Sequence, residues 1–356
     1  MYGFSIFLNE EVSESTLTYM EKMANSNFRG IFTSIHIPED DDSKYLARLQ
    51  KLGKFAKENK MELMVDISGN ALQKLGFTYE DVTPLQEIGL TGIRMDYGIS
   101  MEMIAQISRK MDVALNASTI TKHDLDQLKK YEADFNKMEA WHNYYPRPET
   151  GLAKEHFCSQ NKWLKQAGFT VMSFVPGDGN KRGPLYKGLP TLEKQRDVHP
   201  LAAALELMKD CFVDKIYIGD PGIEESTLEQ FKLYLQKKTL KFHAIPEQKS
   251  SYLHRFDGIH INRVDDARDV IRSAESRMQE VTRIEKEITG ERPVGSITID
   301  NEKYGRYMGE MQITKRDLSA DEKVNVVGKI VKKDLSLLKY CEPGQTFQIE
   351  WLKGDF

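Results

Sequence analysis

The stretch Asn136-Lys137-Met138-Glu139-Ala140-Trp141 opens the strand–helix–strand pattern that decides the fold. The length and apolar content of this stretch predict a short β-strand. An amphipathic helical pattern then covers Ala153–Ala167, Gly168 supplies a stop signal, and a second strand pattern covers Thr170–Phe174. A strand, a helix and a further strand in this order predict a βαβ unit, in which the two strands lie parallel.

The same alternation of strand and helix patterns runs through residue 240. Eight βα repeats within this length fit a TIM barrel, whose usual size is about 250 residues. An open, doubly wound sheet is the alternative, but eight strands is the closing number and the first turn lacks a Gly-x-Gly-x-x-Gly pattern. The eight strand-like runs are Phe4–Leu8, Gly30–Ile35, Glu62–Asp66, Gly92–Asp96, Asp112–Asn116, Asn136–Trp141, Thr170–Phe174 and Lys215–Gly219.

The character of the chain changes after residue 240, so we expect a barrel domain over residues 1–240 and a second domain over 241–356. Ile245-Pro246 and the polar run after it resemble a connection out of the barrel, and a helical pattern comes next around Ala267–Ile288. Later runs with apolar/polar alternation predict a small, mainly antiparallel β domain. These runs are Gly295–Asp300, Met311–Thr314, Lys323–Ile330 and Phe347–Trp351.

The composition is that of a soluble globular protein: 40% of the 356 residues are hydrophobic and 29% are charged, with a net charge of −4. No overall positive field is present to recruit nucleic acid or anionic lipid. The three cysteines have no metal-ligand spacing, and no apolar run approaches the roughly 18 residues of a membrane span. We expect a cytoplasmic protein that binds neither nucleic acid nor membrane and holds no metal.

Polar residues come directly after most of the expected strands, at the end of a TIM barrel where reactive groups gather. A solvated loop or a structural pair between Arg94 and Asp96 is the plainer explanation for any one of them. Together they predict a ligand-binding rim. Its candidates include His36, Asp66, Arg94, Asp96, Asn116 and Asp220.

The loop Trp141-His142-Asn143-Tyr144-Tyr145-Pro146-Arg147-Pro148-Glu149-Thr150-Gly151 is the richest in functional groups. It combines aromatic rings, an imidazole, an amide, a guanidinium and a carboxylate with two prolines and a glycine. Loops of this kind carry function more often than packing, because a rigid scaffold can aim them. We expect a small-molecule site here.

The loop Pro176–Pro184 contains three glycines and the adjacent cations Lys181 and Arg182. Glycines let backbone N–H groups approach an anion, and TIM barrels often bind phosphate with the loops after strands seven and eight. The loop is therefore a candidate phosphate or carboxylate site, with a flexible solvated loop as the alternative.

The rim carboxylates are candidates for glycosidic hydrolysis, which needs one acid and one ionised carboxylate. If Met138 and Ala140 face the helices, Glu139 faces the barrel mouth, where burial raises its pKa. Glu139 is then the expected general acid, and a salt bridge to Arg94 or Arg147 is the alternative. Candidates for the second carboxylate are Asp66, Asp96 and Glu149.

Several segments resemble a bacterial family of 6-phospho-N-acetylmuramidases. They are Gly3–Phe7, Trp141–Gly151, Val175–Asp178, Asp300–Tyr307 and Val324–Gly328, and the likeness covers essentially the whole chain. The resemblance implies a TIM barrel followed by a cyclophilin-like β-barrel domain. It also implies hydrolysis of the β-1,4 bond between N-acetylmuramic acid 6-phosphate and N-acetylglucosamine in peptidoglycan recycling, without a cofactor.

The matching motif residues that would contact this phosphorylated amino-sugar disaccharide are His142, Asn143, Tyr144, Arg147, Glu149 and Asp178. Two alternatives remain. A lyase or aldolase for a phosphorylated sugar acid would need a metal or a Schiff-base lysine, for which Lys137 is the candidate. A non-catalytic phosphosugar-binding regulator would use the second domain as a partner surface. A homodimer is a further possibility, with the second domain as either a lid over the active site or a dimer surface.

Overall fold

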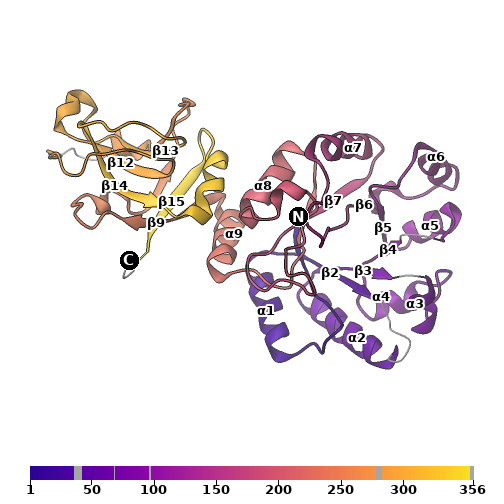
Figure 1. Ribbon diagram of the computed structural model, residues 1–356. Helices are drawn as coiled ribbons and strands as arrows, with labels where there is room; N and C mark the ends of the chain where they lie inside the picture. The colour runs from indigo at the N-terminus through magenta and orange to yellow at the C-terminus, as the bar shows by residue number, and fades with distance from the viewer. Residues whose placement is uncertain (36–41, 68, 96–97, 278–282, 353–356) are drawn as a thin grey trace. The chain divides into compact units, whose positions relative to one another are not determined.

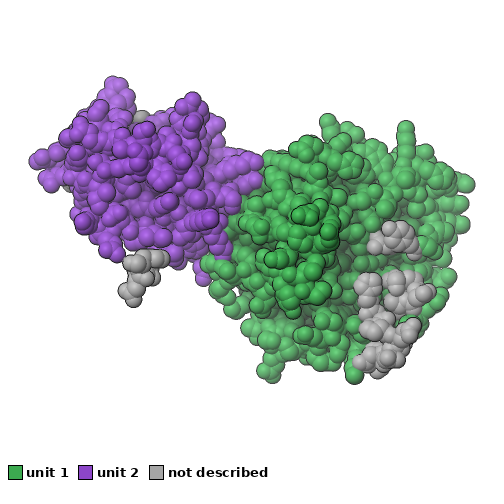
Figure 2. Space-filling model, in the orientation of Figure 1, with its two compact units in different colours: residues 1–228 green, residues 229–356 purple. Residues whose placement is uncertain are grey.

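The computed structural model describes residues 1–35, 42–67, 69–95, 98–277 and 283–352. The chain divides into two compact units, Met1–Leu228 and Glu229–Phe356, which Figure 2 shows in different colours. In the described part of the chain, none of the helices combines the length and the apolar character that crossing a membrane requires.

The first unit is a closed barrel of eight parallel strands, with β8 hydrogen-bonded back to β1. The helices lie outside the ring of strands (Figure 1). The predicted TIM barrel is therefore confirmed. The strands are β1 Tyr2–Ser5, β2 Gly30–Ile35, β3 Glu62–Ile67, β4 Gly92–Met95, β5 Asp112–Asn116, β6 Met138–Trp141, β7 Thr170–Val175 and β8 Lys215–Ile218.

Local signals set several helix ends. Ser13 accepts a hydrogen bond from Thr16 N, and Thr121 with Asp124 forms a capping box. Gly168 has a φ of +100°, the left-handed conformation that ends a helix. The helices are α1 Glu14–Asn25, α2 Asp42–Glu58, α3 Gly69–Lys74, α4 Thr83–Glu87, α5 Met101–Ser108, α6 Lys122–Lys130, α7 Lys154–Gln166, α8 Pro200–Asp210 and α9 Glu225–Lys237, with 3₁₀ turns η1 Phe135–Lys137 and η2 Glu193–Gln195.

The barrel interior is layered. Charged residues occupy the N-terminal ends of four strands: Glu62, Asp112, Glu139 and Lys215. The residue two positions further along each of these strands faces the same way, because side chains alternate along a strand. These residues belong to one buried apolar cluster, which comprises Phe32, Met64, Ala114, Trp141, Met172, Phe174 and Tyr217. The cluster separates the charged layer from the mouth of the barrel.

Lys215 pairs with two of the three carboxylates in this charged layer. Its Nζ donates to Glu139 Oε1 at 2.8 Å and to Glu62 Oε2 at 2.5 Å, and Trp141 Nε1 donates to Glu139 Oε2 at 2.6 Å. Burial raises the pKa of Glu139, while Lys215 opposes that rise. Burial alone would lower the pKa of Lys215, but its two carboxylate partners raise it overall. The ammonium thus stays charged inside the barrel.

The second unit is a seven-stranded sheet in the order β10-β15-β9-β14-β12-β13-β11, antiparallel except for the pair β9 and β15. A bridge between Asn262 and Ser273 brings its edges together, so the sheet is nearly closed into a barrel. The strands are β9 Thr239–Pro246, β10 Ile259–Ile261, β11 Val270–Arg272, β12 Ser296–Asp300, β13 Met311–Thr314, β14 Val324–Ile330 and β15 Thr346–Trp351, with turns η3 Leu253–Phe256, η4 Glu275–Arg277, η5 Glu302–Tyr307 and η6 Lys332–Tyr340.

The helix expected around Ala267–Ile288 is wrong over the residues that the structure describes there, 267–277 and 283–288. Val270–Arg272 pairs with β13, and the chain continues into the short turn η4. The Ile271 side chain, which the helical pattern assigned to the face of a helix, is buried in the sheet by its pairing with Ile313 on β13. Ile245-Pro246 belongs to β9 and is not a connection.

Replacing Lys215 by Met should destabilise the first unit, because Glu139 would remain buried without its cation. We expect a loss of about 3–5 kcal/mol in the free energy of unfolding, measured with denaturant. The matched control is Lys162→Met, since Lys162 is an exposed residue of α7. Equal stability of the two variants would contradict a supporting role for the buried ion pair.

Asp300, at the end of β12, makes the stability of the second unit pH-dependent. It is 4% exposed, and burial, with the charges of Glu310 and Asp321, raises its pKa from 3.8 to about 7. Between these values the folded protein holds a proton that the unfolded chain releases, so raising the pH favours unfolding. Asp300→Asn should raise Tm relative to wild type at pH 8 and leave it near wild type at pH 4.

Glu291→Gln is the control for this measurement, because Glu291 is an exposed carboxylate of the same unit. A Tm difference between Asp300→Asn and wild type that stays constant from pH 4 to pH 8 would show that the Asp300 proton does not contribute.

Candidate active site

Three predicted rim residues meet at the mouth of the barrel. Asp66 and Arg94 are partners in register on β3 and β4, and Arg94 Nη1 lies 3.0 Å from Asp66 Oδ2. Arg94 Nη2 donates to Asn143 Oδ1 at 2.6 Å, which ties the loop after β6 to the same group. Arg94 is buried, whereas the Asp66 side chain is 21% exposed. The carboxylate is thus held by a fixed cation and remains reachable.

Tyr144 and Arg182 form a second polar group beside it. The Tyr144 ring packs edge-on against Phe174 at 5.1 Å, and its hydroxyl accepts a hydrogen bond from Arg182 Nη1 at 2.5 Å. Arg182 Cζ also lies 4.0 Å from the centre of the Phe7 ring. Burial raises the pKa of Tyr144, Arg182 opposes that rise, and the charge of Asp66 adds to it. Arg182 therefore links the loop after β7 to the mouth.

Two carboxylates shape the loops after β7 and β8. Asp220, fully buried after β8, accepts backbone hydrogen bonds from Gly177, Leu189 and Arg182 at 2.9, 2.9 and 3.3 Å. Asp178 accepts from Glu224 N at 2.9 Å and from Thr227 Oγ1 at 2.6 Å. Both oxygens of Asp178 are thus used within the protein, so the structure places it as an organiser of the loops.

A cleft of about 1090 Å³ lies among the loops after β1, β7 and β8. Its walls carry both signs of charge. Lys181 and Arg182 come from the loop after β7, and Glu10 and Glu11 come from the loop after β1. Tyr186, which is largely exposed, also lines the cleft. These features suit a polar ligand that carries anionic groups.

The loop at residues 141–151 divides its side chains between core and surface. Trp141 lies in the apolar cluster, and His142 faces α7, where its Nε2 lies 2.6 Å from Asn161 Oδ1 and its ring packs against Phe157. Burial lowers the pKa of His142 to about 4. The structure therefore places His142 outside the mouth. Arg147 and Glu149 are exposed on the loop surface.

Arg196, Glu193 and Thr191 hold this loop, although no local sequence signal pointed to them. Arg196 Nη2 donates to Tyr145 O at 3.0 Å and to Arg147 O at 3.3 Å. Glu193 accepts from Gly151 N at 2.8 Å, and Thr191 Oγ1 donates to Asn143 O at 2.8 Å. They lie more than 40 residues along the chain from the backbone groups they bind, so only the closed fold brings them together.

The expectation that Glu139 lies at the mouth is wrong. It does face the barrel interior, but on the far side of Trp141, in the charged layer with Lys215 and Glu62. Glu139 forms its salt bridge with Lys215, whereas the alternative considered from the sequence was a salt bridge with Arg94 or Arg147. Lys137, the lysine considered for a lyase, lies in η1 before β6 begins, at the opposite end from the mouth.

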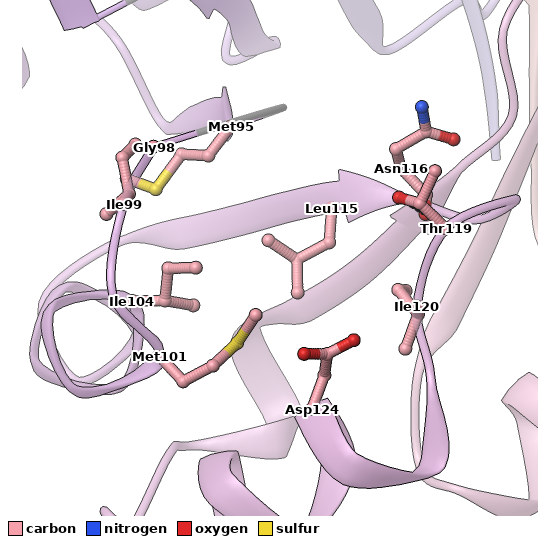
Figure 3. A pocket seen from close by; sticks show the side chains of 10 residues that line it. All are labelled: Met95, Gly98, Ile99, Met101, Ile104, Leu115, Asn116, Thr119, Ile120 and Asp124. Carbon is pink, nitrogen blue, oxygen red and sulfur yellow. Dashed lines mark hydrogen bonds between the residues drawn. The ribbon is translucent and has the colours of Figure 1, made fainter.

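The remaining candidates lie elsewhere or outside the described residues. Asn116 is buried at the end of β5 and accepts a hydrogen bond from Ser118 N at 3.1 Å. It borders a small, mostly apolar pocket of about 190 Å³ between α5 and α6, and its carboxamide points away from Met101 and Ile104 (Figure 3). His36 and Asp96 fall outside the described residues.

Within the described residues, Glu62, Asp112 and Glu139 have the spacing of a possible metal site, with carboxylate oxygens within 4.8 Å of one another. Lys215 Nζ already donates to two of these three carboxylates. Lys215, Glu62, Asp112 and Glu139 thus form a partly buried ion network in which the ammonium pairs with two of the three carboxylates.

Comparison with known proteins identifies the family. A model described as 6-phospho-N-acetylmuramidase, N-terminal, matches residues 2–233, and its C-terminal counterpart matches residues 239–350. A crystal structure of a conserved Enterococcus faecalis protein with an unknown function is 51% identical, with a TM-score of 0.92 over 99% of this chain and 96% of that one.

A crystal structure of an uncharacterized B. cereus protein shares the fold at 24% identity, with a TM-score of 0.76 over 98% of this chain and 99% of that one. No curated protein matches the chain. Because the two family models together span both units, the chain belongs to the 6-phospho-N-acetylmuramidase family.

Proposed function

We propose that this protein hydrolyses the β-1,4 bond between N-acetylmuramic acid 6-phosphate and N-acetylglucosamine, as a cytoplasmic step of peptidoglycan recycling. The observation that carries the proposal is the match of both units to the two halves of one muramidase family.

The cations that line the cleft support this substrate. The disaccharide carries a phosphate and a lactyl carboxylate, and Lys181 and Arg182 both line the cleft. A charge-assisted hydrogen bond contributes about 1.5–3 kcal/mol, so two such contacts discriminate strongly against neutral disaccharides. Tyr186 offers an exposed aromatic face for a sugar ring.

We assign the ionised catalytic carboxylate to Asp66. It is the carboxylate that Arg94 fixes at the mouth, and it stays partly exposed to a ligand. In a glycosidase this group either attacks the anomeric carbon or removes a proton from the attacking water, while a second carboxylic acid protonates the leaving oxygen. Glu149 on the loop after β6 and Glu10 in the cleft are the candidates for that acid.

The direct test is incubation of the pure, full-length protein with the 6-phosphorylated disaccharide, followed by measurement of free N-acetylglucosamine. We expect its release from this substrate and much slower release from the unphosphorylated disaccharide. Binding without release would support the regulator alternative. Trapping of a covalent adduct by borohydride, or loss of activity in a chelator, would support the lyase or aldolase alternative.

Two carboxylate variants distinguish the sequence-based assignment from the structural one. Asp66→Asn should lower kcat by a factor of about 10² or more, because it removes the ionised group at the mouth. Glu139→Gln should chiefly lower Tm, since Glu139 contacts Lys215 and Trp141 in the charged layer. A loss of kcat in Glu139→Gln with an unchanged Tm, and none in Asp66→Asn, would reverse the assignment.

A further inference from the structure

The loops after β7 and β8 pack against each other through glycines. A Cβ on Gly222 would lie 2.8 Å from Asn180 N, and a Cβ on Gly179 would lie 2.9 Å from Ile223 C. Real Cβ atoms do not approach backbone so closely, so the two backbones can touch only where side chains are absent. This close approach brings the amide groups of both loops to the same part of the cleft, which residues 179–183 and 221–223 line.

The hydrogen bonding of these loops leaves a run of amides open. Asp220 takes the N–H groups of Gly177 and Arg182, and Asp178 takes that of Glu224. Among the residues that the structure describes, the N–H groups of Gly179, Asn180, Lys181 and Gly222 donate to no carbonyl or side chain. Gly222 is buried, and buried amides are normally satisfied, so a ligand or solvent acceptor is expected here.

Side chains at the same place carry positive charge and a further open donor. Lys181 lines the cleft and makes no ion pair with another described residue. Arg182, held by Phe7 and Tyr144, lines it as well. The Tyr19 hydroxyl also borders the cleft and is buried without a hydrogen-bond partner in the described structure. Glu11 in the loop after β1 is neutralised by Arg48, at 2.9 Å, which limits repulsion of an anion.

We propose that the open amides of Gly179, Asn180, Lys181 and Gly222, with the Lys181 ammonium, form the binding site for the substrate's phosphomonoester. The inference rests on the proposed function and specifies which part of the cleft takes the phosphate. A phosphate presents several anionic oxygens, which several backbone N–H groups and one ammonium can satisfy together. Arg182 connects this phosphate site to Tyr144, so the attached sugar is directed towards Asp66.

The test measures binding of the product N-acetylmuramic acid 6-phosphate and of unphosphorylated N-acetylmuramic acid to the full-length protein by calorimetry. Lys181→Met removes the ammonium, and Gly222→Ala places a methyl group against Asn180 N. Each variant should weaken binding of the phosphorylated sugar by roughly tenfold to a hundredfold, and leave binding of the unphosphorylated sugar close to wild type.

Two matched variants control for charge and for backbone change. Lys162→Met removes an exposed lysine of α7, and Gly290→Ala adds a methyl group where nothing lies within 4 Å. Both should bind like wild type. Equal loss for the two sugars, or full phosphate preference in Lys181→Met, would overturn the proposed site. Lys181→Met leaves the backbone unchanged, so it decides the matter if Gly222→Ala folds poorly.

The two proposals fail separately. If the wild-type protein prefers the phosphorylated sugar and the Lys181→Met variant does not, the phosphate site holds even when no N-acetylglucosamine is released. If the wild-type protein cleaves the disaccharide but the Lys181→Met variant still prefers the phosphorylated sugar, the proposed function holds and the proposed phosphate site is wrong.

Discussion

Closure of the barrel between β8 and β1 is the constraint on which the rest depends. In a closed barrel the inward-facing side chains of the eight strands lie in layers, and here the layers differ in polarity. The N-terminal layer is charged, with Lys215 paired to two of its three carboxylates, and the middle layer is apolar. At the mouth, polar side chains such as Asp66, Arg94 and Asn143 can face a ligand because the apolar layer beneath them carries the packing.

The loops after β7 and β8 also contain carboxylates with a structural role. Buried Asp220 and the twice-bonded Asp178 satisfy selected backbone amides and fix the loops after β7 and β8. These two carboxylates, which lie near the proposed phosphate site, therefore accept hydrogen bonds from loop amides, and they determine which amides remain without a partner in the protein. Arg182 then joins the loop to the mouth through Tyr144. The proposed phosphate site and the proposed catalytic carboxylate thus lie at two neighbouring parts of one rim.

The sequence predicted the barrel because strand and helix periods repeat locally, and it placed Asp66 and Arg94 at one rim because strand ends converge. The contacts of Arg94 with Asp66 and Asn143 come from the structure. It misplaced Glu139 for a physical reason. Alternation along β6 predicts that Glu139 faces the barrel interior. Its distance from the mouth depends on the tilt of the strands. Arg94 pairs in register with Ala114, and Ala114 pairs with Glu139, but the tilt moves each successive partner further from the mouth. Arg196 and the open amides near Gly222 depend on contacts across loops, which no local pattern reveals.

A crystal structure of the full-length protein with bound N-acetylmuramic acid 6-phosphate tests the central claim most directly. We expect the phosphate against the amides of residues 179–181 and Gly222, with the sugar ring reaching past Tyr144 towards Asp66. Phosphate bound in the second unit, or a sugar ring with Asp66 turned away from it, would contradict both the phosphate site and the role of Asp66.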